Sequence, residues 1–170
     1  MIDKVADLTA GTYYIAAYQE TYTENKVTTT YSPYHYHLWT GKIVNSKDCE
    51  TIRHSYENSV LVVDDSDATT GTYAAIELVA VEGEANVYYI KVGDLYLTST
   101  KVAENRSLKL DSEQTKWTAS DHSKGGVILA AKDKQVQLGS AKAKSAMIRS
   151  YKDSSAGSSL SSGLFFFKQN

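Results

Sequence analysis

The chain has 170 residues, of which 18 are Lys or Arg and 20 are Asp or Glu, and its formal net charge is −2. Because neither sign forms a long run, the basic surface expected of a nucleic-acid-binding protein is missing. A chain of this length fits one domain and buries roughly two-thirds of the surface that its unfolded form would expose. Apolar residues never run together for the length of a membrane-spanning helix, so we expect no membrane insertion.

Cysteine usage and the first residues bear on the cellular compartment. Cys49 is the only cysteine, which excludes an internal disulfide and a zinc site built on several cysteines. We interpret Cys49 as a small residue in a polar loop. Residues 1–15 show no basic segment followed by an apolar core. The sequence as written fits a cytoplasmic or non-classically secreted protein, and it fits a secreted protein if a leader was removed, so the localisation stays unknown.

The first predicted unit covers residues 10–82. Apolar residues that recur at every second position predict half-buried strands. Four such strands are predicted: residues 11–17, the pair Tyr36 and Leu38, residues 59–63 and residues 74–79. Long polar stretches at 18–34 and 42–58 separate the first three strands, and we expect loops there. A weak helical pattern occurs near residues 46–55.

The second predicted unit, residues 86–121, is the shortest. It holds four apolar runs of period two: residues 88–90, 95–97, 108–110 and 117–119. Four strands in so few residues leave no room for a helix.

The third predicted unit covers residues 125–170. Its four strands are expected at residues 126–131, 136–138, 146–151 and 163–167. The stretch 152–159 is rich in Ser and Gly, a composition that favours a flexible loop.

Three units of four strands predict a single all-β domain, residues 1–170, with twelve strands. A repeat of roughly 40 residues with four strands leaves a propeller or a β-trefoil, and three units are too few for a propeller. The segments GTYYI, AIELV, VYYIKVGDLYLTST and TKWTAS resemble the unit of β-trefoil proteins, in which a Tyr-x-Ile strand, a Leu strand and a closing Trp or apolar strand recur three times. The expected core consists of Ile15, Ile90, Leu129, Leu38, Leu97, Leu138, Ile76, Trp117 and Phe165.

Within that fold, the chain resembles the ricin-B-like lectins, whose closing strand carries Gln-x-Trp. Here Gln114-Thr115-Lys116-Trp117 has one residue more. In those lectins an acidic residue accepts hydrogen bonds from sugar hydroxyls, an aromatic ring covers the sugar, and an amide completes the site. The resemblance implies these roles for Asp94, Tyr96 and Asn105 in the second unit, and for Asp133 with Gln135 in the third. The alternative is that these acidic residues are ordinary hairpin-turn residues.

A second candidate site is the aromatic stretch 31–39, entered by the loop that carries Tyr22. Tyr34, Tyr36 and Leu38 would face one side of a strand, and His35, His37 and Trp39 the other. Since Tyr36 and Leu38 align with the apolar pairs of the other units, the second set is expected on the outer face, where rings can stack on a ligand. The alternative is that the long first loop covers this face and buries Trp39.

Motifs of catalysis are missing from the sequence. It contains no G-x-S-x-G, no P-loop and no strand followed by G-x-G-x-x-G. We interpret Asp64, Asp65 and Asp67 as solvated turn residues. The pair His35 and His37 has metal-ligand spacing, but no carboxylate or Cys nearby completes a site. We therefore expect no enzyme activity, no metal and no cofactor.

The expected function is non-catalytic, lectin-like binding of a glycan or glycoprotein through loop aromatics and Asp or Asn hydrogen bonds. One alternative is a β-trefoil protease inhibitor, resembling the disulfide-free trefoil inhibitors of fungi, whose partner is a protease. Its contacts would come from the long 18–34 loop and from the loop near Ser155. A further alternative is a protein-interaction module without a small ligand.

Overall fold

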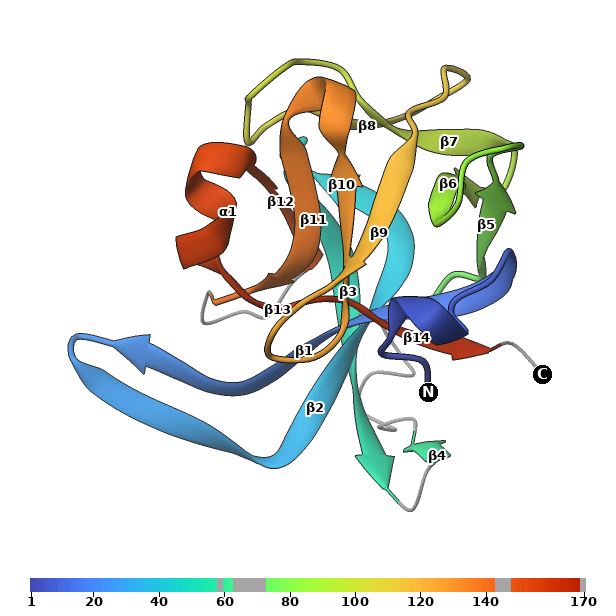
Figure 1. Ribbon diagram of the computed structural model, residues 1–170. Coiled ribbons are helices and arrows are strands. Elements are labelled where there is room, and N and C mark those ends of the chain that lie inside the picture. The colour runs from blue at the N-terminus through green and yellow to red at the C-terminus, as the bar shows by residue number, and fades with distance from the viewer. Residues whose placement is uncertain (58–59, 63–72, 143–147, 169–170) are drawn as a thin grey trace.

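The computed structural model describes residues 1–57, 60–62, 73–142 and 148–168 (Figure 1). These residues form fourteen strands, and every pairing between them is antiparallel. The strands are β1 (Gly11–Glu24), β2 (Val27–Val44), β3 (Asp48–Glu57), β4 (Val60–Val62), β5 (Ile76–Ala80), β6 (Val87–Val92), β7 (Leu95–Ser99), β8 (Leu108–Asp111), β9 (Trp117–Asp121), β10 (Val127–Ala131), β11 (Val136–Ala141), β12 (Ile148–Lys152), β13 (Leu160–Ser162) and β14 (Phe165–Lys168). The predicted all-β class is confirmed.

Consecutive strands pair in three similar groups. β1, β2 and β3 form one antiparallel set, β6, β7 and β8 a second, and β10, β11 and β12 a third. The first and third sets also join each other, because β3 pairs with β12 at Cys49 and Ile148.

Six strands form a closed ring. β1 pairs with β5, β5 with β6, β6 with β9, β9 with β10, and β14 returns to β1. The remaining contact, between β10 and the residue just before β14, is a single bridge in which Val127 and Leu164 exchange backbone hydrogen bonds of 2.8 and 2.7 Å. A closed ring leaves no exposed edge between its members.

Two glycines permit the closure between β10 and β14. Gly126 has φ of +79°, and a Cβ added to it would lie 2.6 Å from the carbonyl carbon of Gly163. A Cβ added to Gly163 would lie 2.3 Å from the backbone nitrogen of Val127. The two chains approach this closely only because neither residue carries a side chain.

All nine predicted core residues are buried, but they lie in two clusters. Seven belong to the main cluster, whereas Leu38 and Phe165 pack in a second cluster with Ala16, Tyr36 and Phe167. Their neighbours Trp39 and Phe166 enter the main cluster instead. Successive residues of a strand point to opposite faces. A shift of one residue in the predicted alternation therefore assigns Leu38 and Phe165 to the main cluster in place of Trp39 and Phe166.

The stretch 18–34 is not the predicted loop, since its backbone lies in β1 and β2 apart from a turn at Asn25 and Lys26. Both turn residues have positive φ, 51° and 64°, as the tight two-residue turn of a hairpin requires. Residues 42–58 likewise contain the end of β2 and all of β3 instead of a long loop. Thr and Tyr have polar groups but favour strands, which explains the error at 18–34.

The predicted flexible loop at 152–159 is instead the helix α1 (Asp153–Ser159). Its Ala156 is 2% exposed and packs with Ile128, Tyr151 and Leu160. Three other predictions fall partly or wholly on residues that the structure does not describe. They are the ends of the strand at 59–63, the start of the strand at 146–151, and the turn with Asp64, Asp65 and Asp67.

Cys49 lies in β3, fully buried, and not in a polar loop. Burial raises the pKa of its thiol well above the ordinary value. Beside it, Arg149 of β12 donates hydrogen bonds from Nε and Nη2 to the two carboxylate oxygens of Asp48, which is 7% exposed. This paired geometry links the first and third strand groups.

Replacing Gly163 by Ala should lower the free energy of unfolding by about 1–3 kcal/mol, because the added Cβ would force the β10 backbone away. Urea unfolding followed by circular dichroism measures the change. The matched control is Gly157→Ala in α1, where an added Cβ meets nothing within 4 Å. The control should leave the stability unchanged or raise it, by up to about 1 kcal/mol from helix propensity. Equal effects of both substitutions would contradict the close approach.

Candidate ligand-binding site

Trp39 is a core residue, which corrects its expected place on the outer face. It is 1% exposed and belongs to the main cluster. Its indole Nε1 donates a 2.9 Å hydrogen bond to the carbonyl oxygen of Lys42. Leu38 on the opposite face is also fully buried, so β2 is covered on both sides here. A ring buried in this way cannot stack on a ligand.

The other members of the aromatic stretch give no assembled site. Tyr22 lies in β1 opposite Thr29, and Tyr34 and His35 lie in β2, but the side chains of these three are outside the described part of the structure. His37 is partly buried in β2, opposite Ala17 and Arg53 in the neighbouring strands.

The structure does not bring together the three residues expected to form the sugar site of the second unit. Asp94 is exposed in the turn just before β7, and Asn105 lies in the connection after it. The five residues of β7 separate these ends by about 16 Å at the usual rise of a strand. The side chain of Asn105 is already engaged, since its Oδ1 accepts a 2.8 Å hydrogen bond from the backbone N–H of Lys152. The ring of Tyr96, in β7, packs edge-on against the ring of Tyr89, and the two ring centroids are 6.2 Å apart.

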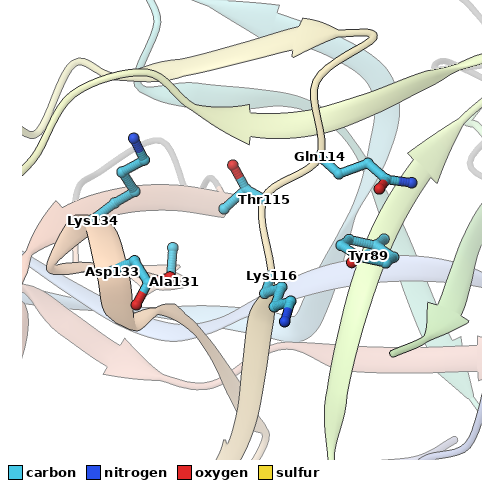
Figure 2. Close-up of a pocket in the computed structure, with 7 residues that line it drawn as sticks. All are labelled: Tyr89, Gln114, Thr115, Lys116, Ala131, Asp133 and Lys134. Carbon is cyan, nitrogen blue, oxygen red and sulfur yellow. The ribbon is translucent and has the colours of Figure 1, made fainter. Parts of the chain in front are cut away.

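Two hollows lie in the described part of the structure, and the one that we call the seam hollow is lined by a predicted residue, Asp133 (Figure 2). Its volume is about 240 Å³. The lining residues come from β6, from the segment that enters β9, and from the end of β10 with the 3₁₀ turn η2 (Lys132–Lys134): they are Tyr89, Gln114, Thr115, Lys116, Ala131, Asp133 and Lys134. Gln135, expected to act with Asp133, is not among them.

Figure 2 shows Tyr89 and Gln114 on one side of the segment that leads into β9, and Asp133 on the other. The ring of Tyr89 is partly exposed, and Gln114 and Asp133 are exposed. The seam hollow thus offers a flat aromatic surface, a carboxamide and a carboxylate within one depression.

The charges of the seam hollow are partly compensated. Lys116 Nζ lies 2.6 Å from Glu84 Oε2, and this hydrogen bond is the main cause of the raised pKa of Lys116. The charge of Asp133 makes a smaller contribution that also raises the pKa of Lys116. No acidic partner of Lys134 occurs within the described ranges.

Backbone contacts hold the walls of the seam hollow in place. The hydroxyl of Thr115 accepts a 3.1 Å hydrogen bond from the N–H of Ser99 in β7. The carbonyl of Lys134 accepts a 2.8 Å hydrogen bond from the N–H of Ala103. Gln135 ends η2 with φ of 54°, and its carbonyl accepts a 2.9 Å hydrogen bond from the N–H of Asp153. The side chains of the hollow are therefore carried by a rigid frame.

Sequence reasoning missed Tyr89, Gln114 and Lys116. The alternation of β6 contained a signal for one of them, because Ile90 faces the core and Tyr89 must then face outward. In the sequence, Gln114 and Lys116 stand out only because the segment 114–117 has one residue more than the Gln-x-Trp pattern. Their approach to Asp133 depends on the pairing of β9 with β10.

A second hollow, of about 410 Å³, is lined by Ile43, Asn45, Ser46, Leu108, Lys109 and Leu110. It offers neither an aromatic ring nor a carboxylate. Lys109 is occupied by an ion pair of 2.9 Å with Asp111, whose pKa this hydrogen bond lowers to about 2. The seam hollow is chemically better suited to a polar ligand.

Within the described ranges, no three His, Cys, Asp or Glu side chains are grouped as a metal site would need. No helix in the same ranges has both the length and the apolar character to cross a membrane. Comparison of the chain with protein-family models, with curated proteins and with solved structures finds no match in any of the three.

Replacing Trp39 by Ala should cost about 3–5 kcal/mol of stability, because a large buried ring leaves a cavity. Trp39→Phe should cost less, since most of the buried surface remains and only the hydrogen bond to Lys42 is lost. Denaturant unfolding gives the change in unfolding free energy for both variants, provided that the dependence of this free energy on denaturant concentration is the same as in the wild type. A loss below about 1 kcal/mol for Trp39→Ala would mean that Trp39 is a surface residue after all.

Proposed function

We propose that this chain is a β-trefoil that binds carbohydrate without catalysis, and that the seam hollow is its binding site. The ring of six strands and the three antiparallel groups support the trefoil, since each group has the same order of pairings. The one observation that carries the functional proposal is that Tyr89, Gln114 and Asp133 all line this one hollow.

Each of these groups suits one feature of a sugar. The ring of Tyr89 matches the apolar face of a pyranose and keeps a phenol for hydrogen bonding. The carboxylate of Asp133 accepts hydrogen bonds from hydroxyls, and a charged acceptor makes such bonds stronger. The carboxamide of Gln114 donates and accepts, so it can pair with a hydroxyl in either direction. Lys134 adds a donor at the edge of the hollow.

The first experiment is a glycan array probed with the full chain. Hits that share one terminal sugar would support the proposal, and an array without hits at high protein concentration would overturn it.

For a glycan found in this way, Tyr89→Ala and Asp133→Asn should each weaken binding about tenfold or more, the loss expected for one stacked ring or one charge-assisted hydrogen bond. The matched control is Asp94→Asn, because Asp94 is also an exposed hairpin-turn carboxylate but lies outside the hollow. Calorimetric titration of the three variants measures the affinities. A loss with Asp94→Asn and none with Asp133→Asn would move the site to the second unit.

Protease inhibition is the second candidate, favoured by the β1–β2 hairpin that extends away from the other strands (Figure 1). Its turn residues, Asn25 and Lys26, are exposed, as a segment entering a protease cleft must be. The other segment considered for this role is the helix α1, packed on its neighbours through Ala156.

If the chain is an inhibitor, papain or trypsin should lose activity when the protein is added in excess. Lys26→Ala, which removes the only basic side chain of the exposed turn, should reduce inhibition of trypsin, which cleaves after basic residues. Undiminished activity of both proteases would count against this candidate without affecting the carbohydrate proposal.

A further inference from the structure

The β1–β2 hairpin carries a ribbon, residues 21–31, that we call the arm. Figure 1 shows it extending from the rest of the molecule. Within it, Thr21 pairs with Thr30, Tyr22 with Thr29 and Glu24 with Val27. Every residue from 24 to 30 is exposed, and Val27 is 64% exposed. Over residues 24–30, the body of the protein therefore covers neither face of the arm.

An isolated two-stranded hairpin is marginally stable in water, and a third strand or a covered face is what usually stabilises it. Residues 27–30 pair with β1, and the described pairing of β2 with β3 begins only at His35. Within the described ranges, residues 27–31 of β2 thus form an edge of the sheet, and a sheet edge is a template for another strand.

We propose that this edge pairs with the same edge of a second copy of the chain, in an antiparallel arrangement with two-fold symmetry centred on Thr29. The two arms then form a four-stranded sheet. The proposal is independent of the carbohydrate site, since the arm contributes no residue to the seam hollow.

The sequence of the β2 edge suits pairing with itself. With Thr29 opposite Thr29 of the second copy, Val27 lies opposite Tyr31 and Thr28 opposite Thr30. Pairs between a β-branched and an aromatic residue, and pairs of threonines, are favourable across strands. No charged residue occurs between positions 27 and 34, so no like charges meet.

The β1 edge of the arm does not suit such pairing. An antiparallel pairing centred on Tyr22 would place Glu20 opposite Glu24 of the second copy, and like charges directly opposite destabilise a sheet. This difference between the edges selects one symmetric contact. It also opposes the addition of further copies along β1, so the assembly closes as a dimer.

The register of the hairpin favours Thr29 as the centre. With a two-residue turn, Glu24 and Val27 exchange backbone hydrogen bonds, and the alternation of an antiparallel pair continues along the strand. The backbone groups of Thr30 then point to the outer side, and the two copies of Thr29 form a pair without mutual backbone hydrogen bonds. Such pairs have the closest side chains, with Cα atoms about 4.5 Å apart.

Sedimentation velocity of the full chain over a range of concentrations tests the proposal. The wild-type protein should form a dimer whose population rises with concentration, because an interface made of one short strand edge from each copy is small and therefore weak. Thr29→Lys should abolish the dimer by placing two ammonium groups side by side, and so should Thr29→Glu with two carboxylates. An equimolar mixture of the two variants should restore a dimer, because opposite charges then meet.

The matched control is Thr21→Lys, which adds the same charge to the same arm on the other strand and should leave the dimer intact. Circular dichroism establishes that each variant is folded, and the restored dimer of the mixture makes the same point for the two Thr29 variants. A wild-type monomer at submillimolar concentration would overturn the proposal. So would a dimer of Thr29→Lys alone, a mixture that stays monomeric, or equal loss with Thr21→Lys.

Discussion

Two backbone hydrogen bonds between Val127 and Leu164 join β10 to the residue just before β14, and the rest of the architecture depends on this contact. They complete a ring that begins with β1 and its partner β14. They form only because Gly126 and Gly163 bring the two backbones closer than side chains would allow. With the ring closed, hydrophobic residues of all three strand groups, such as Ile15, Ile90 and Leu129, pack in one cluster.

The candidate site is a consequence of the same closure. β10 is held between β14 and β9, so the turn at its end stands beside the segment that leads into β9. Asp133 belongs to that turn, and Lys116 to that segment. On the other side, β9 pairs with β6, which carries Tyr89. Three segments far apart in the sequence therefore contribute to one depression, although none of them is distinctive alone.

Much of the fold could be predicted from hydrophobic alternation. Ile15, Ile90 and Leu129 were correctly expected in the core, because period two identifies the inner face of a strand without knowledge of its partners. Hydrophobic alternation gives a wrong prediction where a polar segment has a high strand propensity, as in the Thr-rich segment of β1 and β2. It also failed at Trp39, since a strand buried on both sides has no outer face to predict.

The candidate site could be predicted only in part. Asp133 and Asp94 both lie in turns between consecutive strands. From the sequence alone, the two carboxylates are equally good candidates for a sugar-binding residue. What distinguishes them is the surroundings, because Asp133 lies beside Lys116 and across from Tyr89, whereas Asp94 is outside both described hollows. The resemblance implies a ligand-binding role for the side chain of Asn105, whereas in the structure its Oδ1 accepts a hydrogen bond from the backbone N–H of Lys152. Such contacts depend on tertiary pairing, which alternation along one strand does not encode.

Mapping of amide chemical shifts tests most directly whether the seam hollow is the binding site. The nitrogen-15-labelled chain would be titrated with the glycan that binds best on the array. The largest changes are expected at Tyr89, at residues 114–116 and at Asp133, with little change at Asp94 and in the arm. Changes concentrated at Asp94 or in residues 21–31, with none around Asp133, would contradict the account.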